Sequence, residues 1–249
     1  MTKTDVLFVA WNRLRFTKFA FEELLANTNW DLVNQLVVYD DGSIDDTKQW
    51  LRGRTRLIGH VPVDYRMTQF GSPVAVMDDY IGTSQAEWFA KVDNDIVMPP
   101  GWLDALLQVV EEDGMLDLLG CEAGRTMVPQ ANFGGLYWYE EARHIGGVGL
   151  MRVEAFASRR RMTANGRFGF TEWQHEFRPK AGWICPDLLL CSLDQVPMEP
   201  WASLAATYVE KGWAREWPKY HERWPYYWGW WAGPEAWTEY NRLTNGGEA

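Results

Sequence analysis

The sequence has few cysteines and no long apolar run. Its three cysteines, Cys121, Cys185 and Cys191, form no CxxC pair, so we expect neither a disulfide framework nor a zinc site. No segment approaches the roughly 18 consecutive apolar residues that a membrane span requires. The start of the chain leads into only five apolar residues, and we therefore expect no signal peptide. These absences predict a cytoplasmic protein without a membrane span.

Positive charge is also in short supply. The chain has 24 Lys and Arg against 34 Asp and Glu, a net charge of −10, which argues against nucleic-acid binding through the whole surface but leaves room for a local basic patch. With 249 residues, 47% of them hydrophobic, the chain can form one α/β domain with a large core, or a domain with a tail. Tryptophan is abundant instead: 16 in all, half of them after residue 200. We expect a domain over 1–200, with halves 1–120 and 121–200, and a tryptophan-rich extension over 201–249 packed on it.

Strands and helices alternate in the first 120 residues. Apolar runs predict strands at 6–10, 35–39, 56–61 and from 88, while helical spacing predicts helices at 16–26, from 45 or 46, at 72–82 with Ser72 as its N-cap, and at 102–112. Such alternation is typical of a mostly parallel sheet with helices on both faces, in which ligands bind at the carboxyl ends of the strands. Later in the chain we expect a strand and helix at 150–156, a helix at 172–181 with Gly182 as its C-cap, and a helix at 202–211.

The segment from Trp88 to Asp95 combines a buried strand with two carboxylates. A strand places Asp93 and Asp95 on the same face, because side chains alternate with period two. Two such carboxylates repel each other unless a cation is near, and Mg²⁺ or Mn²⁺ with phosphate oxygens suits them. The competing interpretation is an acidic turn that caps the helix starting near Trp102.

The order of motifs resembles the GT-A fold nucleotide-sugar glycosyltransferases of the family-2 type over roughly residues 5 to 185. The resemblance is carried by five segments: Leu7 to Arg13, Val37 to Thr47 with its Asp40-Asp41-Gly42-Ser43 turn, Asp93-Asn94-Asp95 followed by Pro99-Pro100-Gly101, Gly147 to Arg152, and Phe170 to Gly182. The chain departs from the pattern where Trp11 replaces a tyrosine, where Met67 and Asp78 stand near a usual Arg and Asn, and where His175 replaces a second carboxylate.

This resemblance implies a Rossmann-like GT-A domain that binds a UDP-sugar with Mn²⁺ or Mg²⁺. It implies that Asp41 accepts the uracil imide N–H, that Asp93 contacts the ribose or the metal, and that Asp95 ligates the metal. Arg66 is a possible second diphosphate contact, although a solvent-exposed arginine is the simpler interpretation. The implied donor-binding residues are Val9, Trp11, Asn12, Arg13, Asp41, Arg66, Asp93 and Asn94.

The acceptor side of the site is implied by later residues. Glu172 matches the catalytic base of the family, and Glu176 and His175 are its rivals; alternatively Glu172 only caps its helix. Gly147, His175 and Arg160 are expected on the acceptor side. His221 is a possible third metal ligand, because GT-A enzymes of several families use a late histidine in this way.

Three function classes remain open. The first is a metal-dependent glycosyltransferase that moves a sugar to a hydroxyl of a glycan, lipid-linked glycan or small molecule, with the inversion that predominates in the family. The second is a DNA glycosyltransferase acting on hydroxymethylated bases in phage-type DNA, because residues 152–167 hold five arginines against one glutamate; a solvated loop would have the same composition. The third is a non-catalytic carbohydrate-binding relic with tryptophans as sugar platforms, which the intact acidic motifs disfavour.

Overall fold

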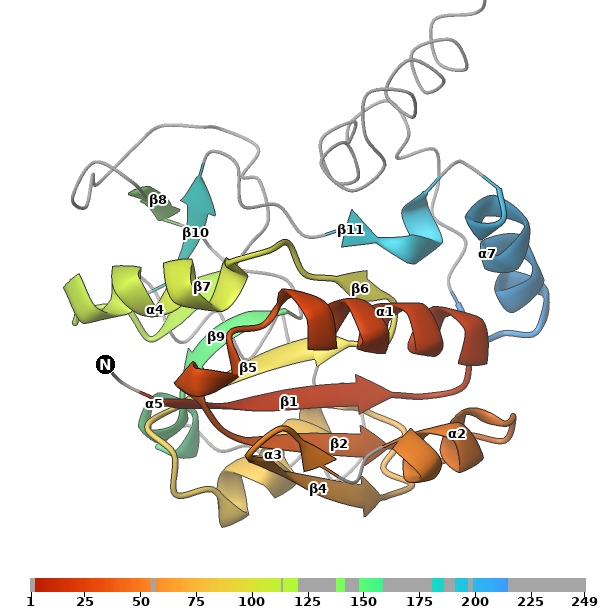
Figure 1. Cartoon of the computed structure of the whole chain (residues 1–249), viewed down its shortest axis with the longest axis horizontal. Helices are drawn as coiled ribbons and strands as arrows, with labels where there is room; N and C mark the ends of the chain where they lie inside the picture. Colours follow the sequence, from red (N-terminus) through yellow and green to blue (C-terminus); the bar gives the residue numbers. More distant parts are fainter. Residues whose placement is uncertain are drawn as a thin grey trace, which may run out of the picture.

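The computed structural model describes residues 3–54, 57–112, 114–120, 138–141, 148–158, 181–185, 191–196 and 199–214. Within these residues nine strands form one sheet in the order β3-β4-β2-β1-β5-β9-β7-β10-β8, and β11 pairs with β6 in a small second sheet (Figure 1). The strands of the main sheet are β1 (Thr4–Ala10), β2 (Val33–Asp40), β3 (Leu57–Ile58), β4 (Val61–Met67), β5 (Trp88–Asp93), β7 (Leu118–Gly120), β8 (Trp138–Glu141), β9 (Gly149–Arg152) and β10 (Ala181–Cys185).

The four strands at the heart of the sheet run parallel. β1 pairs with β2 on one side and β5 on the other, and β2 pairs with β4, all in parallel. β9 lies antiparallel between β5 and β7, and β10 pairs in parallel with β7. Parallel strands need long crossover connections, and helices supply them here. The mixed, mostly parallel sheet with flanking helices confirms the expected α/β fold class.

Helices cover both faces of the sheet, and the two faces of β1 show the division. Val6, Phe8 and Ala10 pack with α1 (Leu14–Asn27) and α4 (Trp102–Glu112) in one core cluster. Leu7 and Val9 pack on the opposite face with α3 (Pro73–Thr83) and α5 (Val153–Ala157). A strand buried on both faces reads as a continuous apolar run, which explains why Val6–Ala10 was recognisable from sequence. The short α2 (Thr47–Arg54) follows β2.

Three sequence expectations require correction. The strand expected at 56–61 is instead β4, Val61–Met67, preceded by the two-residue β3. Asp93 and Asp95 do not share a strand face, because β5 ends at Asp93 and the chain turns at 94–95 before β6 (Ile96–Val97). Gly182 is not a helix C-cap, because it lies within β10 and pairs with Leu119 and Glu141.

The first part of the tryptophan-rich region packs against α1. α7 (Trp201–Glu210) places Trp201 with its ring centroid 4.7 Å from that of Phe19 and 6.0 Å from that of Phe16. The buried Tyr208 ring meets Phe16 edge-on at 5.0 Å. These contacts join α7 to the core cluster on the α1 side. Among the described helices, none is long and apolar enough to cross a membrane.

The carboxyl ends of the central strands come together at one edge of the sheet. The register aligns Ala10 of β1 with Asp40 of β2, Val9 with Asp93 of β5, and Asp40 with Met67 of β4. The arrowheads of these strands point to the same side in Figure 1. The polar loops that follow them therefore lie at the edge where open α/β sheets bind ligands.

Candidate active site

The loop after β1 joins the loop after β2 through Asn12. The Asn12 backbone N–H donates to Ser43 Oγ at 2.7 Å, and Asn12 Oδ1 accepts from the Ile44 N–H at 2.7 Å. Asn12 and Arg13 both have left-handed backbones, with φ of 54° and 61°. Such values are uncommon outside glycine, although asparagine tolerates them better than most residues. This tight turn ends β1 and aims the Arg13 side chain along the edge of the sheet.

Asn94 fixes the turn after β5 to the same loop. Its Nδ2 donates to Asn12 O at 2.9 Å and to Thr17 Oγ1 at 2.8 Å, so both amide hydrogens have partners. Its Oδ1 accepts from Arg13 at 2.7 Å. Asn94 is 2% exposed. Its side chain is thus occupied inside the protein, and its place in the site is structural where we expected a donor contact.

Arg13 and Asp95 form the central ion pair of the site. Arg13 Nη1 lies 2.8 Å from Asp95 Oδ2, while Nη2 holds Asn94. Both side chains keep 13% exposure. Burial lowers the pKa of Arg13, but the carboxylates of Asp95, Asp194 and Asp93 outweigh burial and raise it overall. Arg13 thus donates one charge-assisted hydrogen bond to a carboxylate and a second to a neutral amide oxygen.

Asp93 has a cation of its own. Lys91 stands two residues earlier on β5, on the same face of the strand, and its Nζ pairs with Asp93 Oδ1. The Lys91 side chain is 2% exposed and that of Asp93 29%. Burial raises the pKa of Asp93, and the neighbouring Lys91 charge opposes that rise. Asp93 and Asp95 therefore pair with two different cationic side chains, Lys91 and Arg13, whereas the sequence predicted one metal ion near both carboxylates.

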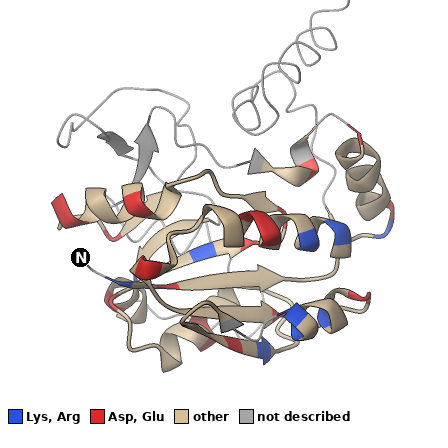
Figure 2. Cartoon of the chain, viewed as in Figure 1, with Lys and Arg blue, Asp and Glu red and all other residues tan. Residues whose placement is uncertain are grey.

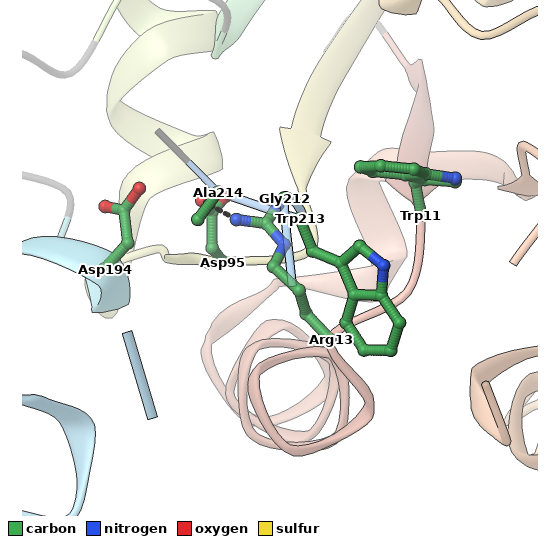
Figure 3. Close-up of a pocket in the computed structure, with 7 residues that line it drawn as sticks. All are labelled: Trp11, Arg13, Asp95, Asp194, Gly212, Trp213 and Ala214. Carbon is green, nitrogen blue, oxygen red and sulfur yellow. Dashed lines mark hydrogen bonds and ion pairs between the residues drawn. The ribbon is translucent and has the colours of Figure 1, made fainter. Parts of the chain in front are cut away.

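A cavity of about 350 Å³ opens beside the Arg13–Asp95 pair. Figure 3 shows its lining side chains, which come from the loop after β1, the turn after β5, the 3-10 helix η3 (Leu193–Gln195) and the end of the α7 segment. The lining residues are Trp11, Arg13, Asp95, Asp194, Gly212, Trp213 and Ala214. Figure 2 shows basic residues at the start of α1, on this side of the molecule.

Asp194 and Trp213 are site residues that sequence reasoning missed. Asp194 follows β11 (Cys191–Ser192) and accepts a 2.6 Å hydrogen bond from Ser192 Oγ. It belongs to no motif, and its only sequence signal was an acidic residue shortly after an apolar run. Trp213 lies just beyond the helix expected at 202–211, and its ring centroid is 6.0 Å from that of Tyr208. The C-terminal segment thus supplies part of the cavity wall.

Asp41 anchors the loop that follows β4. Its Oδ1 accepts from Thr68 Oγ1 at 2.9 Å and from the Phe70 N–H at 2.6 Å, and its Oδ2 accepts from the Ser72 N–H at 3.1 Å. Asp41 is 7% exposed. Its neighbour Asp40 accepts a hydrogen bond from the Ser43 N–H at 2.9 Å, a bond by which aspartate stabilises a turn.

Exposed apolar side chains surround the Asp41 end of the edge. Trp11 is 41% exposed, Met67 52% and Phe70 45%. The Asp41 N–H donates to Ala10 O, next to Trp11, and Met67 ends the neighbouring strand. Exposed aromatic groups beside a buried carboxylate are typical of a surface that binds a flat polar ring.

Arg66, which we expected to contact the diphosphate, is not part of the cavity wall. Its guanidinium donates to Asp64 Oδ2 at 2.7 Å and to Tyr39 Oη at 2.7 Å, and it lies 3.5 Å from Asp79 Oδ2. The Tyr39 hydroxyl in turn donates to Asp79, at 2.5 Å. Arg66 therefore sits in an ion-pair network between β4, β2 and α3, and no residue of the cavity wall is among these partners.

Several expected site residues fall outside the described part of the chain. They are Gly147, Arg160, Glu172, His175 and His221, together with the rival base Glu176. Arg152, which opens the basic stretch 152–167, is described and is occupied. It pairs with Asp117 at 3.3 Å and lies 4.5 Å above the Trp88 ring. The basic surface expected there therefore excludes Arg152.

The cavity fits a divalent cation that arrives with phosphate. Mg²⁺ is usually bound through one or two carboxylates, with substrate oxygens and water completing its shell. Asp95 and Asp194 are two carboxylates that line the same cavity. Among the described residues, no group of three or more His, Cys, Asp or Glu is placed to hold a metal ion by itself. The donor set therefore suits a cation shared with a ligand better than a dedicated protein cage.

Known proteins support the assignment of this fold. The model of the family described as glycosyl transferase family 2 matches residues 5–164, more than half of the chain. This chain belongs to glycosyl transferase family 2. The match spans β1, the Asp40-Asp41 turn, the Asp93-Asn94-Asp95 turn and β9. A search of curated proteins found no match.

Solved structures of S. aureus TarS share the fold of this family-2 chain. TarS 1-349 is 18% identical with a TM-score of 0.53, over 73% of this chain and 58% of that one. A second TarS structure is 16% identical with a TM-score of 0.56, over 84% and 40%. TarS 1-349 in complex with UDP-GlcNAc is 17% identical with a TM-score of 0.52, over 73% and 56%. The chain thus spans about half the length of these proteins.

Proposed function

We propose that this protein transfers a sugar from a UDP-sugar to an acceptor hydroxyl, with a divalent cation at the diphosphate. The observation that carries the proposal is the cavity beside Arg13 and Asp95, at the carboxyl ends of β1 and β5 in a family-2 domain. The guanidinium of Arg13 and the carboxylates of Asp95 and Asp194 at such an edge suit a diphosphate bound with Mg²⁺ or Mn²⁺. The TarS complex with UDP-GlcNAc gives the donor class its support.

The base of the nucleotide belongs at the Asp41 end of the edge. A carboxylate offers about four acceptor positions, and the loop of residues 68–72 fills three on Asp41. The remaining one suits the imide N–H of uracil. The exposed Trp11 and Phe70 rings provide apolar area for stacking. The phosphates then extend toward Arg13 and Asp95.

The transfer has one bond-forming and one bond-breaking event. The acceptor oxygen attacks the anomeric carbon, the bond from that carbon to the diphosphate oxygen breaks, and a base removes the hydroxyl proton. Arg13 is placed to bind the departing diphosphate, and Glu172 is our proposed base. Asp95 and Asp194 would hold a bound Mg²⁺ or Mn²⁺, which would stabilise negative charge on the leaving group. Attack from the face opposite the diphosphate inverts the anomeric configuration.

The test is a panel of nucleotide sugars with Mn²⁺ or Mg²⁺, scored by donor hydrolysis and thermal shift. We expect UDP-sugars to stabilise the protein and to be hydrolysed slowly without an acceptor. UDP should bind more tightly than GDP in calorimetry. Excess EDTA should abolish turnover, and Asp95→Asn should do the same while the protein stays folded. Tighter binding of GDP, or full turnover in EDTA, would contradict the corresponding part of the proposal.

A further inference from the structure

Asp95 already has a cation partner from the chain itself. Arg13 holds the Asp95 carboxylate at 2.8 Å and the Asn94 amide oxygen at 2.7 Å. Asn94 is in turn fixed by Asn12 and Thr17, so Arg13 completes a network that joins the loop after β1, the start of α1 and the turn after β5. Both residues line the cavity, so the guanidinium is paired with a carboxylate to which a divalent cation would otherwise be drawn.

The charges of this edge nearly cancel without any ligand. Asp93 pairs with Lys91 and Asp95 pairs with Arg13, so two negative charges face two positive ones. Only Asp194 adds negative charge to the cavity wall among its described residues. A divalent cation binds protein oxygens chiefly through uncompensated negative charge. The pocket of the free protein is therefore poor in the charge that such a cation needs.

We propose that Arg13 is the resident counter-ion of Asp95 and passes to the diphosphate when the donor binds. This inference rests on the proposed function and deepens it. The diphosphate brings the negative charge that Arg13 needs in exchange for Asp95, and Asp95 then becomes available to the divalent cation. The cation and the nucleotide consequently bind together, each weakly on its own.

The geometry allows this exchange. Arg13 and Asp95 line the same cavity, so the guanidinium can leave one anion for another without crossing the core (Figure 3). Arg13 Nε is buried and has no hydrogen-bond partner among the described residues, so a guanidinium that turns away from Asp95 gives up no hydrogen bond at that nitrogen. A phosphate can accept two parallel N–H bonds from one arginine, whereas here Asp95 accepts one and Asn94 accepts the other.

The first test is a Mn²⁺ titration of the nucleotide-free protein, in which electron paramagnetic resonance measures the fraction of Mn²⁺ that is bound. Arg13→Gln leaves a group that still hydrogen-bonds Asn94 but removes the charge from Asp95. We expect it to bind Mn²⁺ at least roughly tenfold more tightly than the wild type, a change equal to about 1.4 kcal/mol. Arg15→Gln, an exposed arginine two residues on, should leave Mn²⁺ affinity unchanged. Equal or weaker Mn²⁺ binding by Arg13→Gln overturns the inference.

The second test is UDP binding at saturating Mn²⁺, measured by calorimetry. If Arg13 moves to the diphosphate, Arg13→Gln should weaken UDP by roughly tenfold, again with Arg15→Gln as control. If Arg13 stays on Asp95, UDP affinity will not change, and the inference is wrong. Arg13→Lys is the second variant: its point charge cannot hold both partners, so a smaller rise in Mn²⁺ affinity is expected.

The two proposals fail in different ways. If UDP and UDP-sugars do not bind the wild type under any condition, the proposed donor is wrong. The Mn²⁺ titration needs no nucleotide and still decides whether Arg13 competes for Asp95. If UDP-sugars are turned over but the Arg13→Gln titration matches the wild type, the proposed function stands and the role of Arg13 is refuted.

Discussion

The Phe70 N–H donates to the buried carboxylate of Asp41 at 2.6 Å, and the Ser72 N–H donates to its other oxygen at 3.1 Å. The loop after β4 is thus shaped around a side chain of the turn after β2. If the uracil base binds at Asp41 as proposed, a change at Asp41 affects the nucleotide in two ways, through the loop and through the direct contact with the base. The first prediction separates these routes.

Asp41→Asn should weaken UDP binding by roughly 10- to 100-fold, because a hydrogen bond to a charged group contributes about 1.5–3 kcal/mol. Thr68→Val removes one hydrogen bond to the same carboxylate and leaves its charge intact. We expect this variant to bind UDP within a few-fold of the wild type. Calorimetry on both variants checks the prediction. Equal losses in the two would mean that Asp41 acts only through the loop.

The buried pair of Lys91 and Asp93 gives a prediction about stability. Lys91→Met should lower the free energy of unfolding by about 2–3 kcal/mol, somewhat below the cost of breaking a fully buried pair, because the Asp93 side chain keeps 29% exposure. The double variant Lys91→Met with Asp93→Asn should recover most of the loss. Chemical denaturation of the three proteins measures this. No recovery in the double variant would show that Lys91 stabilises through contacts other than the one with Asp93.

The same pair predicts a pH dependence. Burial raises the pKa of Asp93, and loss of Lys91 removes the charge that opposes the rise. When the pKa of a carboxyl is higher in the folded state than in the unfolded state, the folded state loses stability as the pH rises from the unfolded-state pKa to the folded-state pKa. The penalty of Lys91→Met should therefore shrink as the pH falls, because a protonated Asp93 needs no counter-ion, and should be largest at neutral pH. The double variant serves as the reference and should show no such trend.

The sequence predicted the fold well where the elements are buried on both faces. β1, β2 and β5 are continuous apolar runs, and α4 begins and ends where helical spacing placed it. β4 was missed although Val61, Val63 and Tyr65 alternate with polar residues, because Pro62 argues against a strand. Pro62 lies opposite Leu57 of β3, before the register of β4 with β2 begins at Val63.

The pairing of site residues was harder to predict than their identity. The motifs named Arg13, Asn94 and Asp95, but their contacts join segments 81 and 82 residues apart. The alternation of side chains along a strand predicted that Asp93 and Asp95 share one face, which is wrong because the chain turns at 94–95. Asp194 reaches the cavity only because β11 pairs with β6, a contact for which two-residue strands leave almost no pattern.

The arginines beyond α5 give a prediction about the acceptor. Arg159, Arg160 and Arg161 lie outside the described residues, and Arg152 is occupied by Asp117. If the acceptor is DNA, replacing these three arginines by Ala should weaken acceptor binding and flatten its salt dependence, by about one unit of slope per lost phosphate contact. Arg52→Ala in α2 is the control. An unchanged salt slope would favour a neutral acceptor.

Glu172 gives the last prediction, because the transfer needs a base on the face of the sugar opposite the diphosphate. In the proposed site the diphosphate lies beside Asp95 and Arg13, which line the cavity, so the proposed base comes from another segment, and Glu172 matches the family pattern for it. Glu172→Gln keeps size and hydrogen bonding but cannot accept the proton. Transfer should fall by roughly 10²-fold or more, the usual scale for a lost general base, while UDP binding survives.

Glu176→Gln is the matched control, four residues on. If transfer persists in Glu172→Gln and falls in Glu176→Gln, the base is Glu176. If both variants keep transfer, His175→Gln becomes decisive, and a pH–rate profile shifted toward neutral pH would accompany a histidine base.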